Sequence, residues 1–279
     1  MGTSTRLAGP VGGRWQAARG ALTKSLKGLP DDLDAWQSSC DGGGRPVPNS
    51  DSRQMYAGWT DEKVDRHATD FYEAFSEHLR VEPTAFGLVE VSARSGARLV
   101  DILEELGRIG PNAFGLSVGA TPAERAERFL GQFVAAVVGE GGLPADAAAR
   151  RAVVQCGQLL LQEHHDLHHA IDQGDDLPGL TIDDRLFCEI YRLFFDGMVR
   201  ELLSAVVAGK IMVATPMLPV VDPAGTIAAR IAEWVIKRMP MPCEEKTRRG
   251  GNASVVDLGR ELASHALEYA FGIDPGGAL

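Results

Sequence analysis

Signals for the start of an α-helix recur along this chain, whereas no series of alternating polar and apolar residues of the kind typical of strands occurs. The strongest is Thr121-Pro122-Ala123-Glu124, which places Thr at the N-cap, Pro at the first helical position and Glu at the third, as in a capping box. Thr60 and Thr181 each precede acidic residues and predict two further starts. We therefore predict an all-α, or nearly all-α, multi-helix globular bundle of about eight helices.

Apolar residues at helical spacing give the extent of these helices. The predicted helices cover residues 14–29, 60–80, 97–106, 121–138, 146–172, 181–208, 224–238 and 254–271. Residues 86–91 are predicted as one short strand, and residues 244–252 as a charged loop.

Composition limits the classes of protein to which the chain can belong. With 44% hydrophobic and 24% charged residues, its 279 residues can bury a substantial core. A net charge of -10 argues against a general nucleic-acid binder, which needs clustered Lys and Arg. The most apolar stretch, residues 202–221, contains Lys210, Pro216 and Pro219, so we expect no transmembrane span.

Cysteine usage and the N-terminus indicate the compartment. The four cysteines, Cys40, Cys156, Cys188 and Cys243, are far apart in sequence and form no CxxC pair. We expect them to be reduced and mostly buried. No secretory signal is visible in the first 30 residues, and we expect a cytoplasmic protein.

The N-terminal segment, residues 1–37, is a tethered basic amphipathic element. Trp15, Leu22 and Leu26 fall on one apolar stripe, with Arg and Lys around it. This helix can dock on the acidic body of its own chain, bind a protein partner or second copy through these three residues, or contact an anionic membrane. Residues 38–52 have the Gly, Pro and Ser content of a linker, and residues 53–279 form the helical body, with a candidate subdivision near 139–143.

A histidine-rich segment, residues 162–172, is the one place where the sequence suggests chemistry, because it holds four of the seven histidines. On a continuous helix, His164/His168, His165/His169 and His168/Asp172 are each four residues apart, a spacing that suits metal ligation. A helical projection places His164 on the apolar stripe, with His168 beside it, and puts His165 and His169 nearer the surface. The metal would be iron, manganese or zinc.

Two other interpretations of this segment remain open: core histidines beside a solvated polar face, and imidazoles that sense protons near pH 6. His67, His78 and His265 lie on apolar stripes of other predicted helices, where core histidines are common.

No complete catalytic signature occurs, so the sequence leaves open whether the chain is an enzyme. His-Glu-x-x-His, Glu-x-x-His and a phosphate-binding loop are all absent. Our leading hypothesis is a non-enzymatic helical interaction or regulatory protein with a protein partner or a homo-oligomeric state. The alternative is a metal-dependent enzyme or metal sensor, with His164, His168 and Asp172 as ligands, for metal-assisted hydrolysis or oxygen chemistry.

Overall fold

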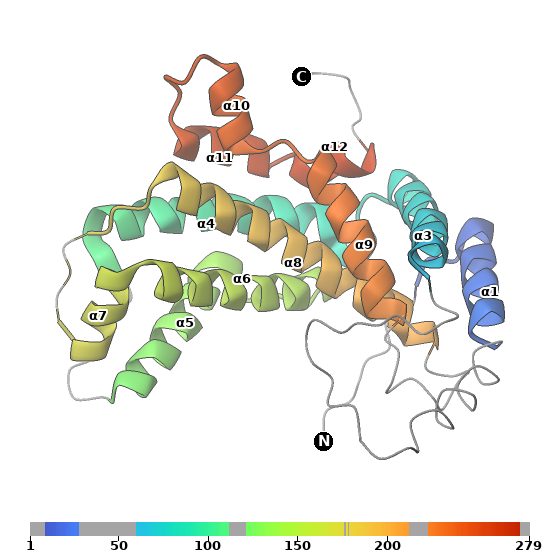
Figure 1. Ribbon diagram of the computed structural model, residues 1–279, viewed down its shortest axis with the longest axis horizontal. Coiled ribbons are helices and arrows are strands. Elements are labelled where there is room, and N and C mark those ends of the chain that lie inside the picture. Colours follow the sequence, from blue (N-terminus) through green and yellow to red (C-terminus); the bar gives the residue numbers. More distant parts are fainter. Residues whose placement is uncertain are drawn as a thin grey trace. The chain divides into compact units, whose positions relative to one another are not determined.

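A computed structural model describes residues 9–27, 60–111, 121–175, 177, 179–211 and 223–273, and the fold below concerns these ranges. Every regular element in them is a helix, so the all-α prediction is confirmed (Figure 1). There are more helices than the eight or so predicted. They are α1 (Gly13–Lys27), α3 (Asp61–Val81), the 3₁₀ turn η1 (Ala85–Gly87), α4 (Leu88–Ile109), α5 (Pro122–Val138), α6 (Pro144–Glu163), α7 (His165–Gln173), α8 (Asp184–Ile211), α9 (Pro223–Arg238), α10 (Pro242–Arg248), α11 (Val255–Ala263) and α12 (Ala266–Phe271).

The chain divides into two compact units. The smaller comprises Met1–His78 and Leu203–Ile231, and the larger comprises Leu79–Leu202 and Ala232–Leu279. Residues 139–143, where we expected a subdivision, lie within the larger unit. The predicted linker, residues 38–52, lies outside the described residues, as do residues 212–221 of the apolar stretch. In the described part of the chain, no helix combines the length and apolar character that crossing a membrane requires.

In the larger unit, α4, α6 and α8 run side by side and bury a core rich in aromatic residues (Figure 1). The phenyl ring of Phe195 in α8 packs against α4 so closely that a Cβ on Gly96 would lie 2.9 Å from it. The side chain of Arg151 in α6 forms an ion pair with Glu201 of α8 at 2.6 Å. The core therefore depends on a small residue at position 96 of α4.

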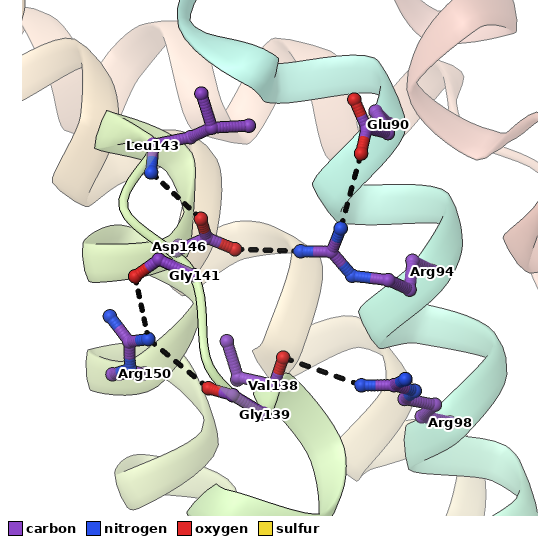
Figure 2. Close-up of polar contacts among 9 residues, drawn as sticks. All are labelled: Glu90, Arg94, Arg98, Val138, Gly139, Gly141, Leu143, Asp146 and Arg150. Atoms are coloured by element: carbon purple, nitrogen blue, oxygen red, sulfur yellow. Dashed lines mark hydrogen bonds and ion pairs between the residues drawn. The ribbon is translucent and has the colours of Figure 1, made fainter.

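A buried carboxylate fixes the start of α6 (Figure 2). Asp146 is 1% exposed, and its Oδ2 accepts a hydrogen bond of 2.8 Å from the backbone N–H of Leu143, the N-cap residue. Its Oδ1 lies 2.7 Å from Nη2 of Arg94 in α4. A Cβ on Gly141 would lie 2.3 Å from Asp146 Oδ2, so only glycine fits there. This carboxylate joins the α5–α6 turn to α4.

Arginines hold the rest of this turn (Figure 2). Arg150 Nη2 donates to the carbonyls of Gly139 at 3.1 Å and Gly141 at 2.9 Å. Arg98 Nη1 lies 3.5 Å from the carbonyl of Val138. Carbonyls at the end of α5 and in the turn, which have no partner within a helix, thus receive charged donors.

Several predicted boundaries are confirmed. α5 has the full capping box, in which the Glu124 amide donates to Thr121 Oγ1 at 3.3 Å and the Thr121 amide donates to Glu124 Oε2 at 2.8 Å. Thr60 accepts a hydrogen bond from the amide of Lys63 at the start of α3. The start of α8 differs, because Asp183, not Thr181, caps it by accepting from the Leu186 amide at 2.7 Å.

Other predictions are wrong. Residues 86–91 form no strand, since η1 leads directly into α4. Part of the predicted loop 244–252 belongs to α10, and the predicted last helix is divided at Ser264 and His265. Short apolar runs do not distinguish a buried helix from a strand, which explains the first error.

The expectation of four reduced thiols is also wrong. Cys188 of α8 and Cys243 of α10 form a disulfide, with their Cα atoms 6.3 Å apart. Cys156 is a free thiol and is buried, and this burial raises its pKa. Because the thiolate is the reactive form, Cys156 has the character of a core residue rather than of a nucleophile. Cys40 lies outside the described residues.

Candidate functional site

The histidine-rich segment is not one continuous helix, because the chain breaks at His164. This residue has an extended backbone, with φ -107° and ψ 93°, and ends α6. Its Nδ1 accepts a hydrogen bond of 3.3 Å from the Leu167 amide, so the imidazole is the N-cap of α7. One ring nitrogen of His164 is therefore engaged in capping. The prediction of one continuous helix through residues 146–172 is therefore wrong, and His164 precedes the helix that carries His168.

A buried arginine holds the other end of α7. The Nε–H of Arg125 in α5 donates to the carbonyl of Ile171 at 2.5 Å, and its Nη2 donates to the carbonyl of Asp172. Cationic donors at a helix C-terminus satisfy its last carbonyls and complement the helix dipole. Arg125 thereby anchors the C-terminal end of α7 to α5.

A cavity of about 520 Å³, open to solvent, lies between these three helices. Its volume falls within the range of small-molecule sites. α7 contributes two imidazoles and a carboxylate to its wall, and α6 contributes two carboxamides. The lining residues are Ala126, Gln158, Leu161, Gln162, His165, His168, Ile171 and Asp172.

The predicted ligands thus divide into three groups. His165, His168 and Asp172 line the cavity, His164 caps α7, and His169 lies on the exposed side, with its ring centroid 6.4 Å from that of His165. Within the ranges described, no three His, Cys, Asp or Glu side chains form a group that could hold a metal ion. His165 and Asp172 are about 10 Å apart along the helix axis, at 1.5 Å per residue.

The predicted partner-binding residues lie in the core of the smaller unit. Trp15, Leu22 and Leu26 of α1 are all buried. The indole of Trp15 packs on α3, with ring centroids 4.9 Å from Phe71 and 6.3 Å from Phe75. α1 lies beside α3 in Figure 1. Of the three arrangements considered for this helix, the structure contains the one in which it docks on its own chain.

Ion pairs and one internal hydrogen bond join α1 to α3. Arg14 lies 3.5 Å from Glu73 and 3.0 Å from Glu77, and all three side chains are exposed. Nearer the other end of α1, the Ser25 hydroxyl lies 3.0 Å from Nε2 of His67. α1 contains no Asp or Glu, so its charged side chains are all basic.

His67 is the most buried charged or titratable group in this contact, with 3% of its surface exposed. Burial lowers its pKa, because water no longer solvates the imidazolium. Asp70 opposes this shift, while Arg66 and Lys63 add to it. The prediction of a core histidine is confirmed here. His265, by contrast, is exposed and forms a 2.9 Å pair with Glu268.

Two residues that organise these sites could not be found from local spacing. Arg125 acts on carbonyls 46 and 47 residues away, and Ser25 contacts an imidazole 42 residues away. The sequence contained one signal for the role of Arg125: this charged residue lies on the apolar face of a predicted amphipathic helix, where charged side chains are rare. Comparison with protein-family models, curated proteins and solved structures found no match to this chain.

Proposed function

We propose that this chain is a non-enzymatic helical interaction protein and that α1 is its interacting element. The supporting observation is the indole N–H of Trp15, which is buried and has no acceptor among the described residues. A buried donor without an acceptor costs about 1–3 kcal/mol. Among the residues that the structure describes, no acceptor offsets this cost where α1 docks on α3. A partner that supplies an acceptor regains this free energy.

The surface of α3 that α1 contacts indicates the chemistry of such a partner. It combines aromatic side chains, Phe71 and Phe75, with the acidic side chains Glu73 and Glu77, which pair with Arg14. An amphipathic helix binds a groove through apolar anchors spaced along one face. We therefore propose an apolar groove with an acidic rim, on another protein or on a second copy of this chain.

The test compares two substitutions in the full-length chain. Trp15→Phe removes the buried N–H and keeps an aromatic ring, so it should strengthen docking on α3 and reduce association. Arg14→Glu places like charge beside Glu73 and Glu77 and should increase association. Sedimentation velocity over a range of concentrations measures self-association, and capture from the source cells followed by mass spectrometry measures other partners. If neither substitution changes any association, α1 is not the interacting element.

A second candidate function, a metal sensor or metal-dependent enzyme, is favoured by one observation: His165, His168 and Asp172 line the same cavity, although they are spread along α7 and not gathered around one point. Imidazole and carboxylate ligands suit iron, manganese or zinc. Elemental analysis of tag-free protein tests this proposal. A stoichiometric metal that is lost in a His165→Ala, His168→Ala double variant supports it, with His169→Ala as the matched control. Sub-stoichiometric metal in the natural protein removes it.

We also propose a cellular compartment for the protein. We expected a cytoplasmic protein, but disulfides are rare in reducing cytosol. The disulfide between Cys188 and Cys243 therefore favours an oxidising compartment. Alkylation of thiols in intact cells, followed by mass spectrometry, distinguishes the two compartments, because Cys188 and Cys243 are alkylated only if they are reduced.

A further inference from the structure

A disulfide joins two helices of the larger unit, between Cys188 of α8 and Cys243 near the start of α10. Both cysteines are half-buried rather than enclosed in the core, and partly exposed disulfides are the ones that thiols reduce most readily. We propose that this disulfide is a redox switch, which holds α10 on α8 when it is oxidised and releases α10 when a dithiol reduces it. The proposal does not depend on the interaction proposed for α1.

Little apolar surface holds α10 in place. Only two of its seven residues are buried, one proline and one glutamate. Two ion pairs supplement the disulfide: Lys246 with Asp184 of α8 at 2.5 Å, and Arg249 with Glu261 of α11 at 2.8 Å. These four side chains are between 28% and 52% exposed, and exposed ion pairs contribute little and are screened by salt. The disulfide is therefore the main constraint on α10.

The elements on either side of α10 have anchors of their own. α11 packs on α4 as well as on α10 (Figure 1). Its Arg260 forms an ion pair of 2.8 Å with Asp101 of α4, and a Cβ on its Gly259 would lie 2.8 Å from the ring of Phe187. On the other side, Met239, which directly follows α9, is buried. Release of α10 is therefore a local opening between α9 and α11.

Two glycines form a hinge between α10 and α11. Gly250 and Gly251 have φ of +84° and +83°, in the backbone region that favours glycine. A Cβ on either would meet no atom of the described residues within 4 Å. At the other end, residues 239–241 separate α9 from α10. Rotation at these two connections lets α10 leave α8 without displacing α9 or α11.

The switching step is a thiol–disulfide exchange. One thiolate of the reductant attacks Sγ of one cysteine, so a mixed disulfide forms and the bond between Cys188 and Cys243 breaks. The expelled cysteine thiolate takes up a proton. The second thiol of the reductant then displaces the other cysteine, which leaves the reductant as a disulfide and both cysteines as thiols. Two electrons and two protons pass from the dithiol to the protein, and a disulfide oxidant reverses the step.

Amide hydrogen exchange of the full-length chain, with and without dithiothreitol, measures the release of α10. Alkylation and mass spectrometry verify that Cys188 and Cys243 are reduced. Protection of residues 242–251 should then fall by about tenfold or more relative to that of α11, because a disulfide commonly contributes more than this factor. α4 and α11 should remain protected. In the reduced protein, added salt should lower the protection of α10 further, because ion pairs are then its main attachment.

Substitutions identify the thiols responsible. The Cys188→Ser, Cys243→Ser variant should show a released α10 with and without the reductant. Cys156→Ala removes the buried free thiol and keeps the disulfide, so it is the matched control and should respond as the natural protein does. Cys40→Ser tests the fourth cysteine in the same way. Should the double variant fail to fold, re-oxidation of the natural protein with oxidised glutathione keeps the test decisive, since it should restore both the disulfide and the protection of α10.

Several results would overturn the switch. One is protection of α10 that stays unchanged although both cysteines are alkylated. Another is an equal loss of protection in α10 and α11, which would make the disulfide a staple of the whole unit. A disulfide that dithiothreitol does not reduce in the folded protein, or protection that re-oxidation does not restore, has the same consequence. All of these outcomes concern α10, so they leave the function proposed for α1 untouched.

Discussion

The guanidinium Nη2 of Arg94 lies 2.7 Å from Oδ1 of Asp146, a carboxylate that is 1% exposed. The two residues come from α4 and α6 and are 52 positions apart in sequence. Their contact joins the N-cap of α6 to the helix that runs through the centre of the larger unit. Removal of one partner leaves a charge in a buried position.

We therefore predict that Arg94→Ala lowers the free energy of unfolding by about 3 kcal/mol, the lower end for a broken buried ion pair, because Arg94 is partly exposed. Arg98→Ala, one turn along α4, is the control. Arg98 donates to the Val138 carbonyl at a long distance of 3.5 Å, so the loss of its side chain should cost less than about 1 kcal/mol. Urea unfolding measures both, and equal losses would contradict the role given to Asp146.

The cap at His164 should be replaceable by a better capping residue. Asn is among the preferred N-caps, whereas Ala cannot accept from the Leu167 amide. We expect His164→Ala to destabilise α7 locally by about 1 kcal/mol relative to His164→Asn, which is about fivefold in its opening equilibrium. Amide exchange of residues 165–173 reports this directly. Identical exchange in the two variants would mean that the imidazole is not the cap.

Arg125 should be required for the cavity beside α7. Arg125→Met preserves most of the buried aliphatic stem but removes the charged donors to Ile171 and Asp172. A hydrogen bond from a charged group contributes about 1.5–3 kcal/mol, so α7 should lose protection while α6 keeps it. Arg128→Met, exposed on the same helix, is the matched control. Equal protection of α7 in both variants would refute this anchoring.

The disulfide should stabilise the attachment of α10 to α8. Cys188 and Cys243 are 55 residues apart, and a cross-link over a loop of that length contributes about 4 kcal/mol when it constrains the unfolded chain. We expect the Cys188→Ser, Cys243→Ser variant to lose about 2–4 kcal/mol of unfolding free energy, measured in urea. Dithiothreitol should destabilise the natural protein similarly and leave this variant unchanged. A variant that responds to the reductant would show that another disulfide matters.

The sequence alone determined the features that depend on residues a few positions apart. The capping box of Thr121 and Glu124 forms between residues three apart, and α5 begins and ends where its pattern predicts. Helical periodicity likewise predicted the all-α class, and it placed Trp15, Leu22 and Leu26 on one apolar stripe and His67 on another, stripes that the structure buries. These are local properties, because side chains three or four apart on a helix share a face whatever the rest of the chain does.

Tertiary structure decided the features that depend on distant residues. The break at His164 accompanies the anchoring of α7 by Arg125, 46 residues away from Ile171, and no helix-stop signal marks it in the sequence. The pairing of Cys188 with Cys243, of Arg94 with Asp146 and of Ser25 with His67 likewise spans 42 to 55 residues. A spacing pattern shows which face a side chain occupies but not which other helix meets that face. That choice depends on how all the apolar faces are buried together.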